Sequence, residues 1–150
     1  MTLPYPPSAN RYWRTRIVTP RAGAAFVSTY VSKEAEQFKE ACGWLARGAG
    51  VRAPLAGRIA IDYTLHPHRP QDWKTRARKD PLGWEDTVQC IDLDNANKVL
   101  LDALKGVVFE DDKWVREIVA RRGEPRAEAC LVVRVSTIAV ETPQAALELA

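Results

Sequence analysis

Four carboxylates in two short motifs are the residues of this sequence best suited to chemistry. Asp92 and Asp94 lie two positions apart in IDLDNANKVLL, and Asp111 and Asp112 are adjacent in VVFEDDKW. In an extended segment, side chains two residues apart project from the same face. Like charges side by side repel unless a cation compensates them, and Mg²⁺ prefers carboxylate oxygens as ligands. The pattern indicates divalent-metal chemistry, although ordinary surface turns also produce an isolated D-x-D.

Lys98 places a cation four residues after Asp94. On a helix this spacing brings the ammonium back towards the carboxylates, where it could hold a phosphate and stabilise a negatively charged transition state. The alternative is an ordinary i,i+4 ion pair with Asp94 or Asp102, and we interpret Asp102 mainly as that structural partner.

A metal site built from all four carboxylates requires the chain to reverse after Gly106. We expect this reversal to carry Asp111 and Asp112 back to the starting end of the preceding helix, near Asp92 and Asp94. Converging carboxylates would destabilise the fold without a cation. The alternative is a solvated acidic turn before a strand.

The net charge is only +3, but the basic residues gather in two stretches. No Asp or Glu precedes Glu34, and the segment 66–90 is also rich in Lys and Arg. Basic segments beside an acidic cluster suit a polyanionic substrate that is handled by bound metal, although basic loops are often simply solvated. The residues that we expect to contact DNA are Asn10, Arg11, Arg14, Arg16, Arg69, Lys74, Arg76, Arg78 and Lys79.

Local patterns predict the elements that must position these groups. In RIAIDYTL, apolar residues alternate, which is typical of a half-buried strand over 58–65. Apolar residues at helical spacing predict a helix from an N-cap at Ser32 to about Gly48, and another from Asp94 or Asn95 to Gly106. Further strands are predicted over 12–18, 25–31, 113–121 and 129–138.

The remaining segments are expected to be irregular. Prolines exclude a regular helix in LPYPPSAN, which should be extended up to a turn at Ser8-Ala9-Asn10. The stretch 66–90, with three prolines, is predicted to be a long exposed basic loop, and the tail 141–150 could form a short helix. We therefore expect a single compact α+β domain over 1–150, with two main helices packed on a mixed sheet.

Composition excludes several classes. No apolar run approaches the roughly 20 residues that cross a bilayer, and the first residues lack the apolar core of a signal peptide. Cys42, Cys90 and Cys130 lack the paired spacing of a zinc site. We expect a cytoplasmic protein with reduced thiols and no membrane partner.

The strings LPYPPSANRYWR, DLDNANKVLLDAL and FEDDKWV together resemble the RusA-like Holliday junction resolvases of phage and prophage origin. The resemblance covers the N-terminal arm, the helix after Ser32 and the chain from Asp92 to about Thr137. It implies a compact α/β homodimer that binds Mg²⁺, or Mn²⁺ in its place, through Asp92, Asp94 and Asp112. It also implies that Lys98 is essential and that Asp111 is accessory. The segment from the helix end to the second acidic pair, Lys105 to Asp111, is slightly shorter than in the family, so Asp111 and Asp112 could exchange roles. The segment 66–90 is longer than in the family.

The residues and the resemblance predict a metal-dependent endonuclease that cuts two strands of a four-way DNA junction symmetrically, as a two-fold dimer would. Tyr12, Trp13 or Trp73 could stack on bases unpaired at the crossover, or could pack in a core or dimer interface, which we favour for Trp13. The alternative function is a non-catalytic DNA-binding protein of a mobile element. A nucleotide-sugar transferase using D-x-D is disfavoured because no Gly-rich nucleotide loop is present.

Overall fold

A computed structural model describes residues 1–140, so the tail for which a terminal helix was considered lies outside the described residues. The strands are β1 (Thr2–Pro4), β2 (Trp13–Val18), β3 (Phe26–Val31), β4 (Ile59–His66), β5 (Val115–Arg122) and β6 (Cys130–Thr137). The helices are α1 (Ala9–Tyr12), α2 (Lys33–Gly48), α3 (Trp73–Lys79) and α4 (Leu93–Leu104), with 3-10 turns η1 (Trp84–Thr87) and η2 (Asp112–Trp114).

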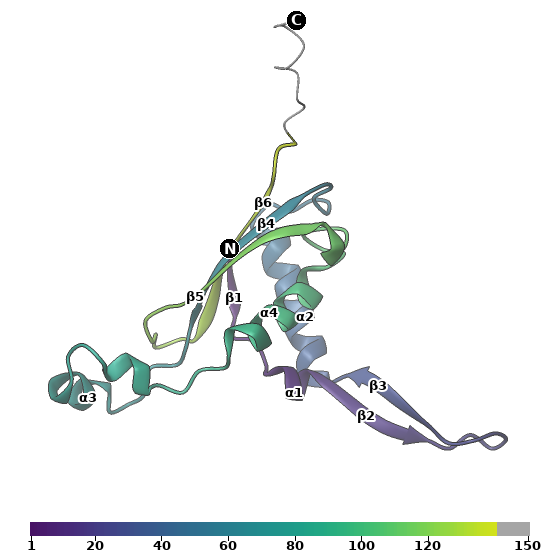
Figure 1. Cartoon of the computed structure of the whole chain (residues 1–150), viewed down its shortest axis with the longest axis horizontal. Coiled ribbons are helices and arrows are strands. Elements are labelled where there is room, and N and C mark those ends of the chain that lie inside the picture. Colours follow the sequence, from purple (N-terminus) through teal and green to yellow (C-terminus); the bar gives the residue numbers. More distant parts are fainter. Residues whose placement is uncertain (141–150) are drawn as a thin grey trace, which may run out of the picture.

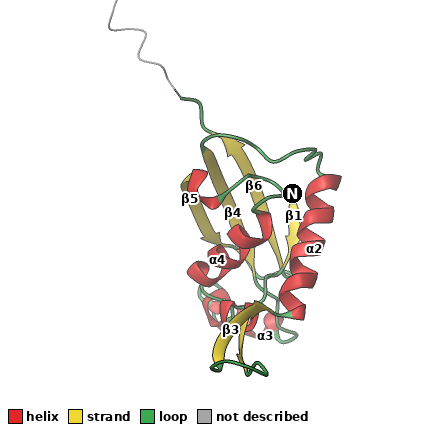
Figure 2. Cartoon of the chain, turned by 90° about the vertical axis from the view of Figure 1, so that its right-hand side faces the viewer, coloured by secondary structure: helices red, strands yellow, loops and turns green. Residues whose placement is uncertain are grey.

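The main sheet has four strands in the order β1-β6-β4-β5. β6 runs antiparallel to both β1 and β4, whereas β4 and β5 are parallel and are joined by the long crossover that contains α3 and α4. Helices α2 and α4 cover one face of this sheet (Figure 2). The prediction of an α+β fold with a mixed sheet and two main helices is confirmed.

The core lies between this sheet and the two helices. The alternation read in RIAIDYTL is confirmed, because Ile59, Ile61, Tyr63 and Leu65 are all buried on the helix side of β4. The N-cap at Ser32 is also confirmed, since its Oγ accepts a hydrogen bond from the Ala35 N–H at 3.3 Å. Helix α4 packs against β4 and α2 in this core.

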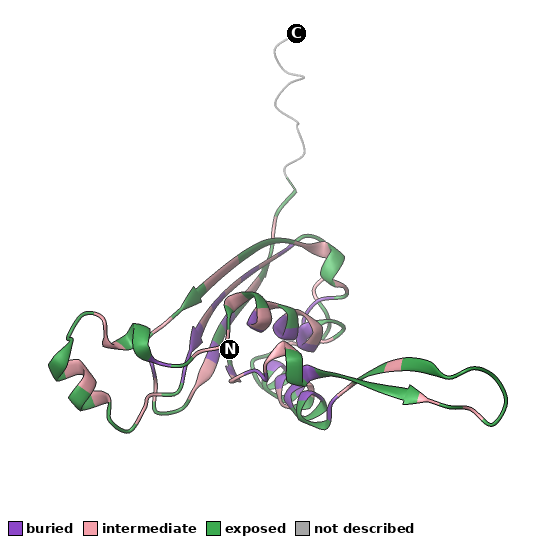
Figure 3. Ribbon diagram, turned by 60° about the horizontal axis from the view of Figure 1, so that its bottom comes forward, coloured by how far each residue is buried: buried purple, intermediate pink, exposed green. Residues whose placement is uncertain are grey.

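Two segments project from opposite sides of this body: the β2–β3 hairpin and the segment around α3 (Figure 1). The hairpin is exposed over most of its length (Figure 3). Ile17 and Val27, which face each other across its two strands, are 74% and 68% exposed. On the alternate face, the Arg16 guanidinium lies 5.4 Å from the Tyr30 ring centre. The hairpin therefore offers an apolar surface and a cationic, aromatic one.

The prediction that 66–90 is a loop throughout is wrong, because WKTRARK forms α3. The run from 71 to 80 contains neither Pro nor Gly, so nothing interrupts a helix between Pro70 and Pro81. An i,i+4 ion pair between Asp72 and Arg76, with Nε 3.0 Å from the carboxylate, supports that short helix. The prolines delimit α3 rather than exclude it.

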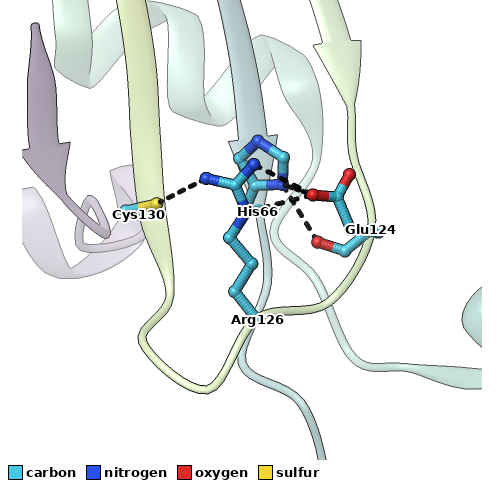
Figure 4. A network of polar contacts seen from close by, with 4 residues as sticks. All are labelled: His66, Glu124, Arg126 and Cys130. Atoms are coloured by element: carbon cyan, nitrogen blue, oxygen red, sulfur yellow. Dashed lines mark hydrogen bonds and ion pairs between the residues drawn. The ribbon is translucent and has the colours of Figure 1, made fainter.

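A polar network attaches the start of the α3 segment to the turn between β5 and β6 (Figure 4). The Nδ1 atom of buried His66 lies 3.0 Å from the Glu124 carbonyl oxygen, and Arg126 pairs with the Glu124 carboxylate at 2.9 Å. The backbone N–H of Arg126 donates to the Pro67 carbonyl, and the backbone N–H of Arg69 donates to the Arg126 carbonyl at 2.7 Å. The base of the projecting segment is thus fixed to the sheet.

Candidate functional site

The first acidic pair lies at the N-terminus of α4. Asp92 is the N-cap residue, in extended conformation and with no side-chain capping bond, and Asp94 lies in the first helical turn. The predicted start at Asp94 or Asn95 is therefore wrong, because Asp92 is itself a favourable N-cap and the helix dipole favours an acid at position 94. The two carboxylates lie at one helix end, but they do not share the face of an extended strand.

Lys98 lies one turn further along α4, as its spacing predicts. Its Nζ is 3.5 Å from Asp94 Oδ2, and the two side chains are 61% and 70% exposed. Asp102 is not its partner, which corrects that part of the interpretation. Asp102 instead accepts a hydrogen bond from the Tyr12 hydroxyl and pairs with Lys39 at 3.0 Å, so its role in the structure is to join α4 to α1 and α2.

Tyr63 anchors this end of α4 to the sheet, a role that the sequence reading missed. Its hydroxyl donates to the Leu93 carbonyl at 3.0 Å. Burial, and secondarily the negative charge of Asp94, raise the pKa of Tyr63 to about 12, so the phenol remains a donor at neutral pH. The signal in the sequence was a tyrosine on the buried face of β4, because a buried hydroxyl needs a partner.

The second acidic pair lies at the opposite end of α4. Lys105, the C-cap residue, pairs with Asp111 at 3.2 Å and with Asp112 at 3.3 Å. Asp111 also accepts a hydrogen bond from the Lys113 N–H, and this bond, helped by Asp112 and Lys105, lowers the Asp111 pKa to about 2. Helix α4 has twelve residues and an axial length of about 18 Å, and the two pairs lie at its opposite ends.

The predicted convergence of the four carboxylates within one chain is therefore wrong. The chain after α4 closes a tight turn, in which Gly106 has a φ of 74° and its N–H donates to the Phe109 carbonyl at 2.7 Å. It then enters β5 beside the start of β4 instead of returning along the helix. Over residues 1–140, no group of three or more His, Cys, Asp or Glu side chains is arranged to hold a metal ion.

The residues expected to contact DNA lie on the two projections and at α1. Asn10 and Arg11 belong to α1, and Arg14 and Arg16 belong to β2. Helix α3 carries Lys74, Arg76, Arg78 and Lys79, and Arg69 lies just before it. The expectation that Tyr12 stacks on bases is wrong, because Tyr12 is fully buried. Trp73 instead lies on the α3 projection, with the Arg69 guanidinium 4.6 Å from its ring centre.

Comparison with known proteins places these motifs in a family. The family model described as endodeoxyribonuclease RusA matches residues 4–136. A comparison with curated proteins gave no match. Among the helices that the structure describes, none is long and apolar enough to span a membrane. Because the family match covers most of the 150 residues and includes both acidic pairs and Lys98, the chain belongs to the RusA endodeoxyribonuclease family.

Proposed function

We propose that this protein is a Mg²⁺-dependent, structure-selective endonuclease that resolves four-way DNA junctions by paired, symmetric nicks. The family match over residues 4–136 carries the proposal. The exposed carboxylate of Asp94 beside Lys98 at the N-terminus of α4 supports it. The resemblance of the motifs to phage and prophage resolvases supports a mobile-element origin, and the free thiols of Cys42, Cys90 and Cys130 suit a reducing compartment.

Asp92 and Asp94 are the metal ligands of this proposal. Mg²⁺ is often held by only one or two carboxylates, with waters and substrate phosphate completing its shell, so this exposed pair fits the ion. Asp92 is available for this role because it makes no capping bond. Bound Mg²⁺, or Mn²⁺ in its place, supplies Lewis-acid activation of water and of the phosphodiester.

We propose that the site is completed in a homodimer. Asp111 and Asp112 lie at the far end of α4 from Asp92, so a second chain is needed to bring both pairs to one phosphate. In a two-fold dimer, the partner subunit's Asp112, with Asp111 accessory to it, would face Asp92 and Asp94. The symmetry makes two equivalent sites, one for each strand that is cut.

Lys98 then acts on the reacting phosphate. Its ammonium stabilises the negative charge that develops as water attacks phosphorus in line. The bond from phosphorus to O3′ breaks, leaving a 5′ phosphate and a 3′ hydroxyl. Since the Lys98–Asp94 pair is exposed, the ammonium can leave Asp94 for the phosphate at little cost. Lys98→Ala should lower turnover more than affinity, and equal losses in both would indicate simple phosphate anchoring.

The direct test is cleavage of a synthetic four-way junction with Mg²⁺ or with EDTA. Wild-type protein should make paired nicks only with the metal, Asp94→Asn should bind the junction without cutting it, and Glu40→Gln, an exposed charge change on α2, should cut normally. Failure of wild-type protein to cut with either Mg²⁺ or Mn²⁺ would refute the nuclease proposal. Binding without cutting would then favour the non-catalytic DNA-binding alternative.

Mixing two inactive variants tests the composite site. Asp94→Asn lacks one acidic pair, and the double variant Asp111→Asn/Asp112→Asn lacks the other. If each site draws on both subunits, a mixed dimer contains one intact site, and it should make single unpaired nicks that neither variant makes alone. If the mixture remains inactive although the subunits exchange, the site is not shared between chains.

A further inference from the structure

A cavity is lined by the residues that directly precede Asp92 in the sequence, and the proposed metal site does not use it. Its volume is about 570 Å³, and Tyr5, Arg11, His68, Arg76, Gln89 and Ile91 are among the residues that line it. They come from the N-terminal arm and α1, from α3 and its base, and from the stretch that leads into Asp92. No Asp or Glu of the described chain lines this cavity, so its fixed charges are the two guanidinium groups.

Arg76 is held in place before any ligand binds. Its Nε donates to the Asp72 carboxylate at 3.0 Å, and its Nη1 donates to Thr87 Oγ1 at 3.1 Å. Its Nη2 makes no hydrogen bond to residues 1–140 that would compete with a ligand. Because Asp72 offsets part of its charge, attraction of an anion also depends on Arg11, whose nearest acid, Glu34, is 3.9 Å away.

Two hydrogen bonds of Tyr5 hold the floor of the cavity, which leads to Asp92. The Tyr5 hydroxyl accepts a hydrogen bond from the Ile91 N–H at 2.9 Å and donates to Cys90 Sγ at 3.6 Å. Burial raises the pKa of Tyr5 to about 12, so this hydroxyl remains protonated at neutral pH. The wall that carries His68 is fixed to the β5–β6 turn by backbone hydrogen bonds between Arg126 and both Pro67 and Arg69.

We propose that this cavity binds the nucleotide next to the scissile phosphate of the cut strand, with Arg11 and Arg76 on its phosphate and Gln89 reading its base. The inference rests on the proposed nuclease function and names a specificity site for it. Ligand cavities of about 300–1,000 Å³ are typical, so one nucleotide fits. The Gln89 amide has both a donor and an acceptor for a base edge, and Val88 and Pro70 provide apolar wall for base and sugar.

A neighbouring cavity of about 350 Å³ shares Tyr5, Arg11 and Ile91 but is also lined by Glu34. Its carboxylate repels a phosphate, so that second cavity does not suit the same ligand. The cationic cavity beside α3 is the one that fits a nucleotide.

The test measures base placement and cleavage on the same junctions. Fluorescence of 2-aminopurine, scanned across the cut position in Ca²⁺ so that no cutting occurs, should change when wild-type protein binds. Gln89→Ala should reduce discrimination among the four flanking bases by about fivefold or more. Arg76→Gln should abolish the fluorescence change and slow cutting by about tenfold.

Controls separate the outcomes. Arg11→Gln gives a second variant in case Arg76→Gln perturbs α3, and Arg52→Gln, in the α2–β4 loop, removes an exposed charge elsewhere and should behave as wild type. If wild-type protein cuts junctions but Gln89→Ala, Arg11→Gln and Arg76→Gln keep its base preference and fluorescence, the cavity does not bind the nucleotide. If wild-type protein does not bind junctions at all, the nuclease proposal fails, and this inference fails with it.

Discussion

Two buried tyrosines allow stability and catalysis to be separated. Tyr63→Phe removes the hydroxyl that fixes the start of α4 to β4, beside Asp94. Tyr12→Phe removes an equally buried hydroxyl whose acceptor is Asp102, in the second half of the same helix. The changes are chemically identical, so their difference reports what each hydroxyl positions.

The structure gives different magnitudes for the two variants. Tyr63 donates to a neutral carbonyl, and such a bond contributes about 1 kcal/mol; Tyr12 donates to a carboxylate, which is worth about 1.5–3 kcal/mol. For a chain of this size, Tm should fall by about 2–4 °C for Tyr63→Phe and by about 3–12 °C for Tyr12→Phe. Because small displacements of reacting groups are costly, kcat should fall by about tenfold in Tyr63→Phe only.

Thermal unfolding and steady-state junction cleavage measure the two effects. The expected result is a crossed pattern, in which the less stable variant, Tyr12→Phe, keeps wild-type kcat and the more stable variant, Tyr63→Phe, loses it. KM for the junction should change little in either variant, since neither hydroxyl is exposed to DNA. If kcat follows stability in both variants, the view that Tyr63 positions Asp92 and Asp94 is refuted.

Three further outcomes follow from packing and charge. Gly123→Ala would place Cβ 2.5 Å from His66 Cε1, so it should lower the free energy of unfolding by about 1–3 kcal/mol. Gly48→Ala, with no atom within 4 Å of its Cβ, should not destabilise the protein. Equal urea midpoints for the two variants would contradict this reasoning. Neutralising Arg76, Arg78 and Lys79 together should reduce the slope of log K against log salt by up to about 2–3, and an unchanged slope would show that α3 does not touch DNA. The pKa values of Tyr5 and Tyr63 are raised to about 12, so the stability that their protonated forms contribute is fully present below about pH 10 and is lost as the pH rises towards 12. The urea midpoint should therefore fall over that pH range. It should fall less steeply in the Tyr5→Phe/Tyr63→Phe variant.

Local sequence was sufficient to predict most elements of this fold. The alternation in β4, the cap and helical spacing of α2, and the hairpin strands β2 and β3 all depend on neighbours a few residues apart. The same local logic identified Asp94 and Lys98 as an i,i+4 pair. It failed at α3, where prolines were interpreted as evidence for a loop although they only delimit a short helix.

Only the tertiary structure decided where the chemistry-bearing groups lie relative to one another. After the turn at Gly106, β5 pairs in parallel with β4, and this pairing between residues far apart in the sequence carries Asp111 and Asp112 away from Asp92. The hydrogen bond from the Ile91 N–H to the Tyr5 hydroxyl, at the floor of the cationic cavity, likewise joins residues 86 positions apart. Periodicity reports which face of an element is buried, but contacts between distant residues form only when whole elements dock, so spacing alone could not reveal them.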